Sequence, residues 1–405
     1  MATMTEPVSE PFHFSMLIYD RRYRSMTIQV AALIGFLLIL SWLVYNTKVN
    51  LETLGKDFNF GFLWNRSGYD INQTAIPYDS NSTHFDAALV GLLNTLMVAF
   101  CGCILATLIG VLVGVLRLSK NWLTARLMAV YVEGLRNVPV VLWIIALFAI
   151  LTNTTPSPNQ FRGENPTASM LFNDSVAFTN RGTYIPRLVF ETPALGVLIV
   201  FILSVAALIW FRSYAHKRQA ATGDILPVFW IGLATLIVPS VLAFFVLGQP
   251  ISLDYPALKG FNFQGGFKIE NSFVALTLAL SLYTGAFIAE NVRAGIMAVS
   301  RGQTEAAYAL GLRPGRTMNL VILPQALRII IPPLISQWLN LTKNTSLGLA
   351  VSYMDLRSTL GGITLNQTGR ELECMLLMML VYLVLSLIIS AVANVYNRSV
   401  KLKER

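Results

Sequence analysis

Residues 290 to 326 read ENVRAGIMAVSRGQTEAAYALGLRPGRTMNLVILPQA. The stretch carries helix signals and lies between two strongly apolar segments, yet it is too polar to span a membrane itself. Ser300 and Gln303 have the spacing of a capping box, which predicts that a helix begins near Arg301. Gly311 stands where a helix C-cap in the left-handed conformation favours glycine. We therefore expect a helix that starts and stops within this polar stretch.

A second helix is expected to follow, because proline marks its start. Pro314 suits the first turn of a helix, and Pro324 interrupts what comes after it. The first helix has a small-residue apolar face made of Ala306, Ala307, Ala309 and Leu310. The predicted structure is a compact helical hairpin that carries Arg293, Arg301, Arg313 and Arg316. An ordinary basic loop between two membrane spans is the alternative interpretation.

The composition places the chain among membrane proteins. Its 405 residues are 55% hydrophobic and only 13% charged, and soluble domains carry about twice that charged fraction. The formal net charge of +9 would suit a nucleic-acid partner. However, the basic residues flank apolar runs instead of forming one patch, which argues against nucleic acid and for membrane lipid.

Eight apolar segments are long enough to cross a bilayer, whose hydrocarbon core of about 30 Å requires about 20 helical residues. The expected spans are 26–45, 87–116, 126–151, 194–211, 226–247, 272–298, 327–352 and 372–396. The first lies too deep in the chain for a typical removed signal peptide, so we expect it to be retained. Pro332 and Pro333 predict that the seventh is kinked, re-entrant or broken.

The distribution of lysine and arginine predicts the orientation of these spans. If the N-terminus is cytoplasmic, 18 of these residues fall on the cytoplasmic side and 10 on the opposite side. Cytoplasmic loops carry the excess of basic residues in membrane proteins. We therefore expect both termini, and the hairpin, in the cytoplasm.

The residues of the predicted hairpin resemble a known sequence motif. Glu305-Ala306-Ala307, Gly311 and Val321-x-Leu323-Pro324 have the order and spacing of the EAA loop of bacterial ABC importer permeases, with valine at 321 where isoleucine is usual. Further matches are Gly91-Leu92-Leu93-Asn94-Thr95-Leu96, Glu133-x-x-Arg136-Asn137-x-Pro139, Leu323-Pro324-Gln325-Ala326, Ile331-Pro332-Pro333-Leu334 and Lys343-Asn344-Thr345-Ser346-Leu347. Together they resemble the polar amino-acid (histidine/glutamine-type) permease family.

The resemblance implies an all-α polytopic membrane protein. Type I ABC importer permeases have a core of five spans, which the second, third, sixth, seventh and eighth spans of this chain resemble. The first, fourth and fifth spans are extra. The enlarged layout resembles the permease subunits of general L-amino-acid ABC transporters. It divides the chain into a cytoplasmic tail (1–25), an extra first transmembrane helix (26–45), a periplasmic loop (46–86), the first part of the core (87–151), an inserted periplasmic loop with two extra spans (152–271), the second part of the core (272–396) with its coupling hairpin (299–326), and a cytoplasmic C-terminal tail (397–405).

The same resemblance implies a subunit of an ATP-driven importer in the bacterial inner membrane. The chain would form half of the translocation pathway beside a second permease of the same family, with a dimer of ATP-binding subunits and a periplasmic amino-acid-binding protein. No G-x-x-x-x-G-K-[ST] motif occurs in the sequence, so ATP and magnesium are expected in the partner ATPase. This chain is expected to be no enzyme and to hold no cofactor or metal, since its three histidines and three cysteines show no ligand spacing.

The resemblance assigns a coupling role to the hairpin, whose first helix would dock on the ATPase. The residues implied are Gln303, Glu305, Ala306, Ala307, Gly311 and Arg313. Small side chains allow close approach there. Glu305 and Arg313 would pair either across that interface or within the hairpin.

Ionisable groups inside membrane spans are candidates for function, because each costs at least ~2.5 kcal/mol to insert. Glu133 and Arg136 are three residues apart on one helix, which favours a local structural pair. The alternative is that Arg136 or Lys343 faces the pathway and holds a substrate carboxylate. The weaker hydrogen-bonding candidates for the pathway are Asn137, Gln337, Asn340, Asn344 and Thr345.

Other polar and small residues in the spans suit packing between helices. We expect Asn94 and Thr95 to make interhelical hydrogen bonds, and Gly110 and Gly114 to allow close helix contact. Glu290 is expected to cap the sixth span or to contact Arg293.

Two other classes of protein are alternatives to a permease. An ion-coupled secondary transporter would use intramembrane carboxylates, of which Glu133 is the clear one. A membrane scaffold that transports nothing is the second. Neither explains the hairpin.

Overall fold

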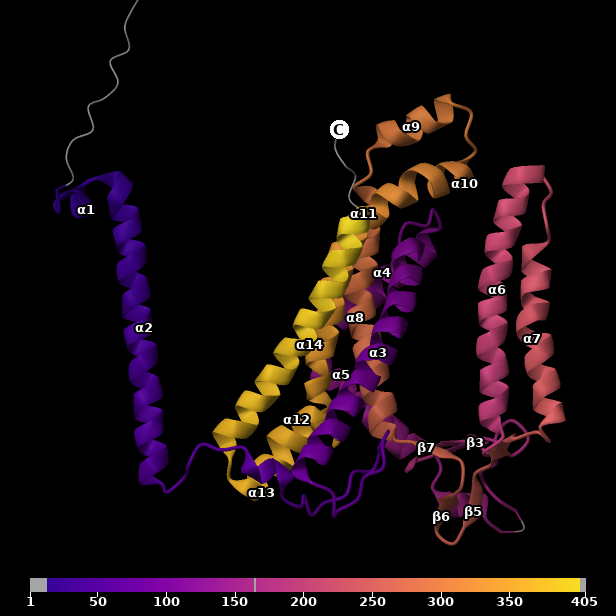
Figure 1. The fold of residues 1–405 in the computed structure, drawn as a ribbon, viewed down its shortest axis with the longest axis horizontal. Coiled ribbons are helices and arrows are strands. Elements are labelled where there is room, and N and C mark those ends of the chain that lie inside the picture. The colour runs from indigo at the N-terminus through magenta and orange to yellow at the C-terminus, as the bar shows by residue number, and fades with distance from the viewer. Residues whose placement is uncertain (1–12, 164, 401–405) are drawn as a thin grey trace, which may run out of the picture. The chain divides into compact units, whose positions relative to one another are not determined.

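The computed structural model describes residues 13–163 and 165–400, so parts of the two expected tails, 1–12 and 401–405, lie outside the described residues. The chain divides into two units after Phe62. The first contains α1 (Met16–Tyr19) and the long helix α2 (Arg21–Thr53), seen in indigo in Figure 1. α2 extends beyond the predicted span of 26–45, since helical hydrogen bonding continues past the apolar run, where Lys48 pairs with Glu52 at 3.8 Å.

Helices of sufficient length and apolar character to cross a membrane correspond to all eight expected spans. In the second unit the long helices are α3 (His84–Leu116), α4 (Trp122–Asn137), α5 (Val140–Thr154), α6 (Ala194–Thr222), α7 (Val228–Val246), α8 (Asn271–Met297), α11 (Leu323–Asn344) and α14 (Glu371–Val400). The mostly helical architecture with about eight spans is therefore confirmed.

The third expected span, 126–151, consists of two helices with a break at Pro139. α4 ends at Asn137, and Val138 adopts an extended conformation (φ −108°, ψ 135°) before α5 starts at Val140. The cause is Pro139, which lacks an amide hydrogen and disfavours helical geometry at the preceding residue. Only the segment from α5 onward is a candidate membrane span by length.

α8 is the central helix of the second unit. It packs against α3, α4, α5 and α11, and the main apolar core is built around Leu276, Leu280 and Ile288. The predicted G-x-x-x-G motif of α3 lies at the α3–α8 contact. A methyl group added at Gly110 would approach Ile288 to 2.5 Å, and one at Gly114 would approach the Ala289 carbonyl oxygen to 2.7 Å. The two glycines thus allow close packing within this chain, as predicted.

After α8 the chain forms the short helices α9 (Arg301–Ala309) and α10 (Pro314–Thr317) and the π-helical turn η3 (Met318–Ile322), and then enters α11. Pro332 and Pro333 lie inside α11 and do not break it. The helix ends at Asn344 and continues as the 3-10 helix η4 (Thr345–Val351), which replaces the last two turns of the predicted 327–352 helix. The segment before α14 contains α12 (Leu356–Ser358), the π-helical turn η5 (Thr359–Thr364) and α13 (Leu365–Thr368).

The inserted segment contains strands that the sequence did not predict. Its short elements are η2 (Pro158–Phe161), β1 (Ala177–Thr179), β2 (Gly182–Ile185), β3 (Arg187–Phe190), β4 (Ile251–Asp254), β5 (Ala257–Lys259), β6 (Asn262–Gln264) and β7 (Phe267–Ile269); a 3-10 turn, η1 (Gly61–Trp64), precedes α3. Antiparallel sheets form in the order β1-β2-β7, β3-β4 and β5-β6. Strands of three or four residues are too short to show an alternating pattern in sequence.

These strands tie the two ends of the insertion together. β2 pairs with β7, which directly precedes α8, and β3 pairs with β4 across the α6–α7 hairpin. Figure 1 shows the strands at the end of α8 that is opposite to α9 and α10.

Substituting Gly110 with alanine is expected to lower the unfolding midpoint of the purified protein in detergent. Overpacking against Ile288 costs about 1–3 kcal/mol, which exceeds the gain of about 1 kcal/mol that alanine brings to a helix interior. The matched control is Gly134→Ala in α4, where an added methyl group meets nothing within 4 Å. Equal or higher midpoints for both variants would contradict the proposed close packing of α3 on α8.

Candidate functional site

The polar stretch after α8 forms the predicted hairpin. α9 begins at Arg301 and ends in a Schellman motif, in which the Gly311 amide donates to the Tyr308 carbonyl (2.9 Å) and the Leu312 amide donates to the Ala307 carbonyl (3.1 Å). Gly311 has φ +75°, the left-handed conformation that favours glycine. The helix boundaries and the C-cap are therefore confirmed.

The N-terminal cap of α9 differs from the prediction, because the capping box is not formed. Ser300 makes no side-chain capping hydrogen bond. The Gln303 side-chain oxygen instead accepts a hydrogen bond from the side-chain amide nitrogen of Gln325 at 3.3 Å. This contact links α9 to the first turn of α11 across the hairpin, so tertiary contact replaces the local cap.

The hairpin exposes most of its coupling candidates to solvent. Glu305, Ala306, Gly311 and Arg313 are exposed, and only Ala307 is buried against the second arm. Leu310 is 82% exposed at the tip. Within the described residues Glu305 and Arg313 form no ion pair with each other or with another group, so the expected pairing inside the hairpin is wrong. Both charges and a large apolar side chain are therefore free to contact another molecule.

An ionic cluster joins α3 to α8 two to three helical turns before α9 begins. Glu290 contacts the guanidinium of Arg293 at 2.6 Å, as predicted, and also that of Arg117 at the end of α3. The side chain of Arg117 is 14% exposed and that of Glu290 is 27% exposed. The role of Arg117 was missed, since it appears in sequence only as a basic residue that flanks a span.

The predicted pair of Glu133 and Arg136 is not formed. Glu133 is exposed, whereas the Arg136 guanidinium lies over the ring of Phe287 on α8, 4.9 Å from its centroid. A cation over an aromatic face is stabilised by the ring quadrupole. Arg136 thus reaches across to the neighbouring helix, and its spacing from Glu133 does not decide its contacts.

The remaining pathway candidates lie along α11. Asn340 and Lys343 are exposed, and Gln337 and Asn344 are half-buried. Thr345 is fully buried, and its hydroxyl donates to the Thr342 carbonyl at 2.8 Å, so it supports the end of the helix. Among the described residues, no hydrogen bond or ion pair joins this group to Arg136 or Asn137.

A buried polar junction fixes the segment between the seventh and eighth spans. The Asn94 amide donates to the carbonyls of Gln73 and Met354, both at 2.9 Å, and the Thr95 hydroxyl accepts from the Leu356 amide at 3.1 Å. Thr95 of α3 thus makes an interhelical hydrogen bond with Leu356 of α12, as predicted. The prediction is wrong for the Asn94 side chain, whose partners are backbone carbonyls outside helices.

Asp355 lies beside this junction, fully buried, and was not singled out from the sequence. Its carboxylate caps α12 by accepting from the Ser358 amide at 2.9 Å. Burial raises the pKa of the Asp355 carboxyl, and the hydrogen bonds from Ser358 partly offset that rise.

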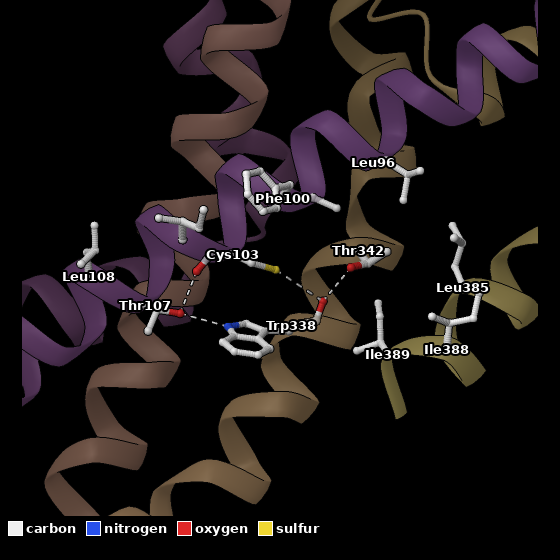
Figure 2. A pocket seen from close by; sticks show the side chains of 12 residues that line it. Leu96, Phe100, Cys103, Thr107, Leu108, Trp338, Thr342, Leu385, Ile388 and Ile389 are labelled. Carbon is white, nitrogen blue, oxygen red and sulfur yellow. Dashed lines mark hydrogen bonds between the residues drawn. The ribbon is translucent and has the colours of Figure 1, made fainter. Parts of the chain in front are cut away.

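An apolar groove of about 550 Å³ lies between α3, α11 and α14. Figure 2 shows its lining, in which the polar atoms satisfy one another: Trp338 Nε1 donates to the Thr107 hydroxyl at 3.0 Å, and Thr342 donates to the Trp338 carbonyl at 2.9 Å. The remaining lining is aliphatic or aromatic. With no unsatisfied polar group, this groove suits apolar contacts and not a polar amino acid.

A multi-span helical unit with a polar, exposed hairpin between two spans is the architecture of a membrane permease. The family model described as "Binding-protein-dependent transport system inner membrane component" matches residues 218–402. The chain is 57% identical over its full length to the glutamate/glutamine/aspartate/asparagine transport system permease protein BztB of Rhodobacter capsulatus, all of which is covered. It belongs to the family of permease subunits of amino-acid ABC importers.

A second relative agrees with this assignment, and one solved structure is similar to the chain. The general L-amino acid transport system permease protein AapQ of Rhizobium johnstonii is 42% identical, with 97% of this chain and 96% of that protein covered. A solved amino acid ABC transporter with histidines is similar at 18% identity and a TM-score of 0.45, covering 78% of this chain and 95% of that one.

Replacing Glu290 with alanine is expected to lower the free energy of unfolding by roughly 1–3 kcal/mol. The substitution leaves the Arg117 and Arg293 guanidinium groups side by side without their carboxylate, and partial exposure moderates the loss. The measurement is chemical denaturation of the purified protein in detergent. Glu305→Ala, which removes an exposed and unpaired carboxylate, serves as the control and should unfold as the unaltered protein does; a similar loss in both variants would argue against the ionic cluster.

Proposed function

We propose that this permease forms half of a translocation pathway and is driven through the Arg301–Thr317 hairpin by separate ATP-binding subunits. The observation that carries the proposal is the exposed hairpin: a rigid cap at Gly311 and an exposed Leu310 flanked by unpaired Glu305 and Arg313. Apolar side chains surrounded by charge are typical of protein interfaces. The coupling residues are Gln303, Glu305, Ala306, Ala307, Gly311 and Arg313.

The proposed substrates are polar L-amino acids, including glutamate, glutamine, aspartate and asparagine. The support comes from the name of the relative that covers the whole chain at 57% identity. The second relative is named for general L-amino acid transport. A broad substrate range fits a pathway that holds the groups common to all amino acids.

The proposed assembly contains a second permease of the same family, a dimer of ATP-binding subunits that hold ATP and magnesium, and a periplasmic amino-acid-binding protein. It sits in the bacterial inner membrane with both termini and the hairpin in the cytoplasm. The excess of lysine and arginine on the hairpin side supports this orientation. The strand-rich insertion then lies on the periplasmic side, where a binding protein docks.

The pathway is proposed to run past the polar residues of the α4–α5 break and of α11. The lining consists of Arg136, Asn137, Gln337, Asn340, Lys343 and Asn344. Broken helices at membrane depth line cavities or protein interiors, where their free backbone groups find partners. Thr345 is left out because it is buried and hydrogen-bonded within the helix.

Gly311→Asp is expected to leave the amount of protein in the membrane unchanged and to abolish amino-acid uptake. An added side chain at Gly311 meets nothing within 4 Å, so the cost to folding is limited to about 1 kcal/mol for the left-handed backbone. The loss of uptake comes from a carboxylate placed in the proposed docking surface. The measurement is radiolabelled glutamine uptake beside immunodetection in membranes.

The matched control is Gly223→Asp. Gly223 ends α6 with φ +78°, also with nothing within 4 Å, so the backbone cost is the same while the hairpin is untouched. Uptake should persist in this variant. Normal uptake by Gly311→Asp, or equal loss in both variants, would refute coupling through the hairpin.

Lys343→Met is expected to reduce the uptake rate of several amino acids at least about tenfold. Loss of an ionic contact of 1.5–3 kcal/mol to a passing substrate accounts for that factor. Lys120→Met, in the exposed turn between α3 and α4, is the control and should transport normally. Unaltered rates in Lys343→Met would remove Lys343 from the proposed pathway.

A further inference from the structure

We propose that the break between α4 and α5 holds a carboxylate-binding site made by Arg136, Trp143 and Asn291. The inference rests on the proposed function, since the carboxylate is taken to be that of an amino acid in transit. It deepens that function by naming the side chains that hold the substrate and the part of the substrate that they hold. Trp143 and Asn291 carry no motif and were not candidates from the sequence.

The first observation is a set of unsatisfied donors. Within the described residues, three buried side-chain nitrogens lack a hydrogen-bond partner: Arg136 Nε, Trp143 Nε1 and Asn291 Nδ2. Burying an N–H group without an acceptor costs about 1–3 kcal/mol, so native proteins leave few of them. The hydroxyls of Thr277, Thr317 and Tyr382 are also buried without a partner in the described part of the chain. The three nitrogens belong to α4, α5 and α8, and both α4 and α5 pack on α8, so one acceptor between these helices would satisfy them.

Packing brings the three elements together around one small cluster. Val132 and Leu135 of α4 and Ala286 and Ala289 of α8 form a buried apolar cluster, against which Trp143 of α5 packs. Trp143 lies in the first turn after the break, and Arg136 lies in the last turn before it. Arg136 and Trp143 therefore flank the break from its two sides, and both contact α8, the helix that carries Asn291.

Phe287 of α8 lies beside Arg136 and one helical turn before Asn291. The guanidinium lies 4.9 Å from the centroid of the Phe287 ring. Asn291 follows Phe287 by four residues on α8, which places both on one face of that helix. The two side chains are half-buried, in contrast to the buried residues that α8 turns toward α3. A substrate in the pathway can reach this face.

The chemistry of the donors selects the ligand. Three N–H groups, one of them on a permanent cation, match the lone pairs of a carboxylate. Among the described residues no carboxylate forms an ion pair with Arg136, since Glu133 is exposed and unpaired and Glu290 binds Arg117 and Arg293. An ammonium group would be repelled there. The ligand is the α-carboxylate of any amino acid or the side-chain carboxylate of an acidic one.

The test is equilibrium binding of radiolabelled L-glutamine and L-glutamate to the purified intact transporter, without nucleotide and without its binding protein. Arg136→Gln should weaken binding at least about tenfold, because it removes a charge-assisted hydrogen bond. Trp143→Phe and Asn291→Leu should each weaken it by about two- to tenfold, as expected for neutral hydrogen bonds. Equal weakening for glutamine and glutamate assigns the α-carboxylate, and weakening for glutamate alone assigns the side-chain carboxylate.

Matched controls lie on the same helix. Arg126→Gln and Trp122→Phe alter an exposed arginine and an exposed tryptophan of α4 and should bind as the unaltered transporter does. Unchanged binding by Arg136→Gln, or equal weakening in the controls, overturns the site.

ATP hydrolysis by the same preparations separates this inference from the proposed function. The control variants Arg126→Gln and Trp122→Phe should keep basal hydrolysis, because the hairpin is intact in them. If no ATPase co-purifies with the chain, the proposed coupling fails, yet the binding measurement still decides whether the three donors hold a carboxylate.

Discussion

Helix α8 lies so close to α3 that Gly110 and Gly114 leave no room for a methyl group against Ile288 and Ala289. Inside a bilayer, apolar side chains gain little by leaving lipid, so helices associate through such close van der Waals contact. The contact lets α8 become the most buried span of the chain. Because α4, α5 and α11 all pack on α8, the positions of the hairpin, of the break and of the polar face of α11 depend on this one interface.

The same helix connects the membrane part to the hairpin. Near its end, Glu290 binds Arg117 of α3 and Arg293 of α8. Ile330 of α11 packs so close to Gly295 that a methyl group added to this glycine would lie 2.4 Å from the Ile330 side chain. Helix ends that are tightly packed and ion-paired move together as a rigid body and do not bend separately. A force applied to the hairpin would therefore move α3, α8 and α11 together, which is the mechanical property that an ATP-driven permease requires.

Polar groups in this membrane protein fall into two kinds. Asn94, Thr95 and Asp355 are buried and hydrogen-bonded to backbone groups, so they fix the loop between the seventh and eighth spans. Arg136, Trp143 and Asn291 instead keep a buried donor without an acceptor. Asn94 and Asp355 also keep one buried oxygen each without a partner among the described residues. What distinguishes the second group is that its free atoms are N–H donors, for which we propose a carboxylate ligand.

The amino-acid sequence by itself determined the eight spans, the hairpin boundaries and the left-handed cap at Gly311, since these follow from local apolar runs and from the backbone preferences of glycine and proline. It also carried the family motifs. Pro139 divided a span whose apolar pattern was continuous, through its local effect on the backbone. Tertiary structure decided the rest: the Gln303 side chain binds Gln325, and Phe287 drew Arg136 away from Glu133. Those outcomes depend on which residues of distant segments meet, and spacing along one helix contains no information about the helix beside it.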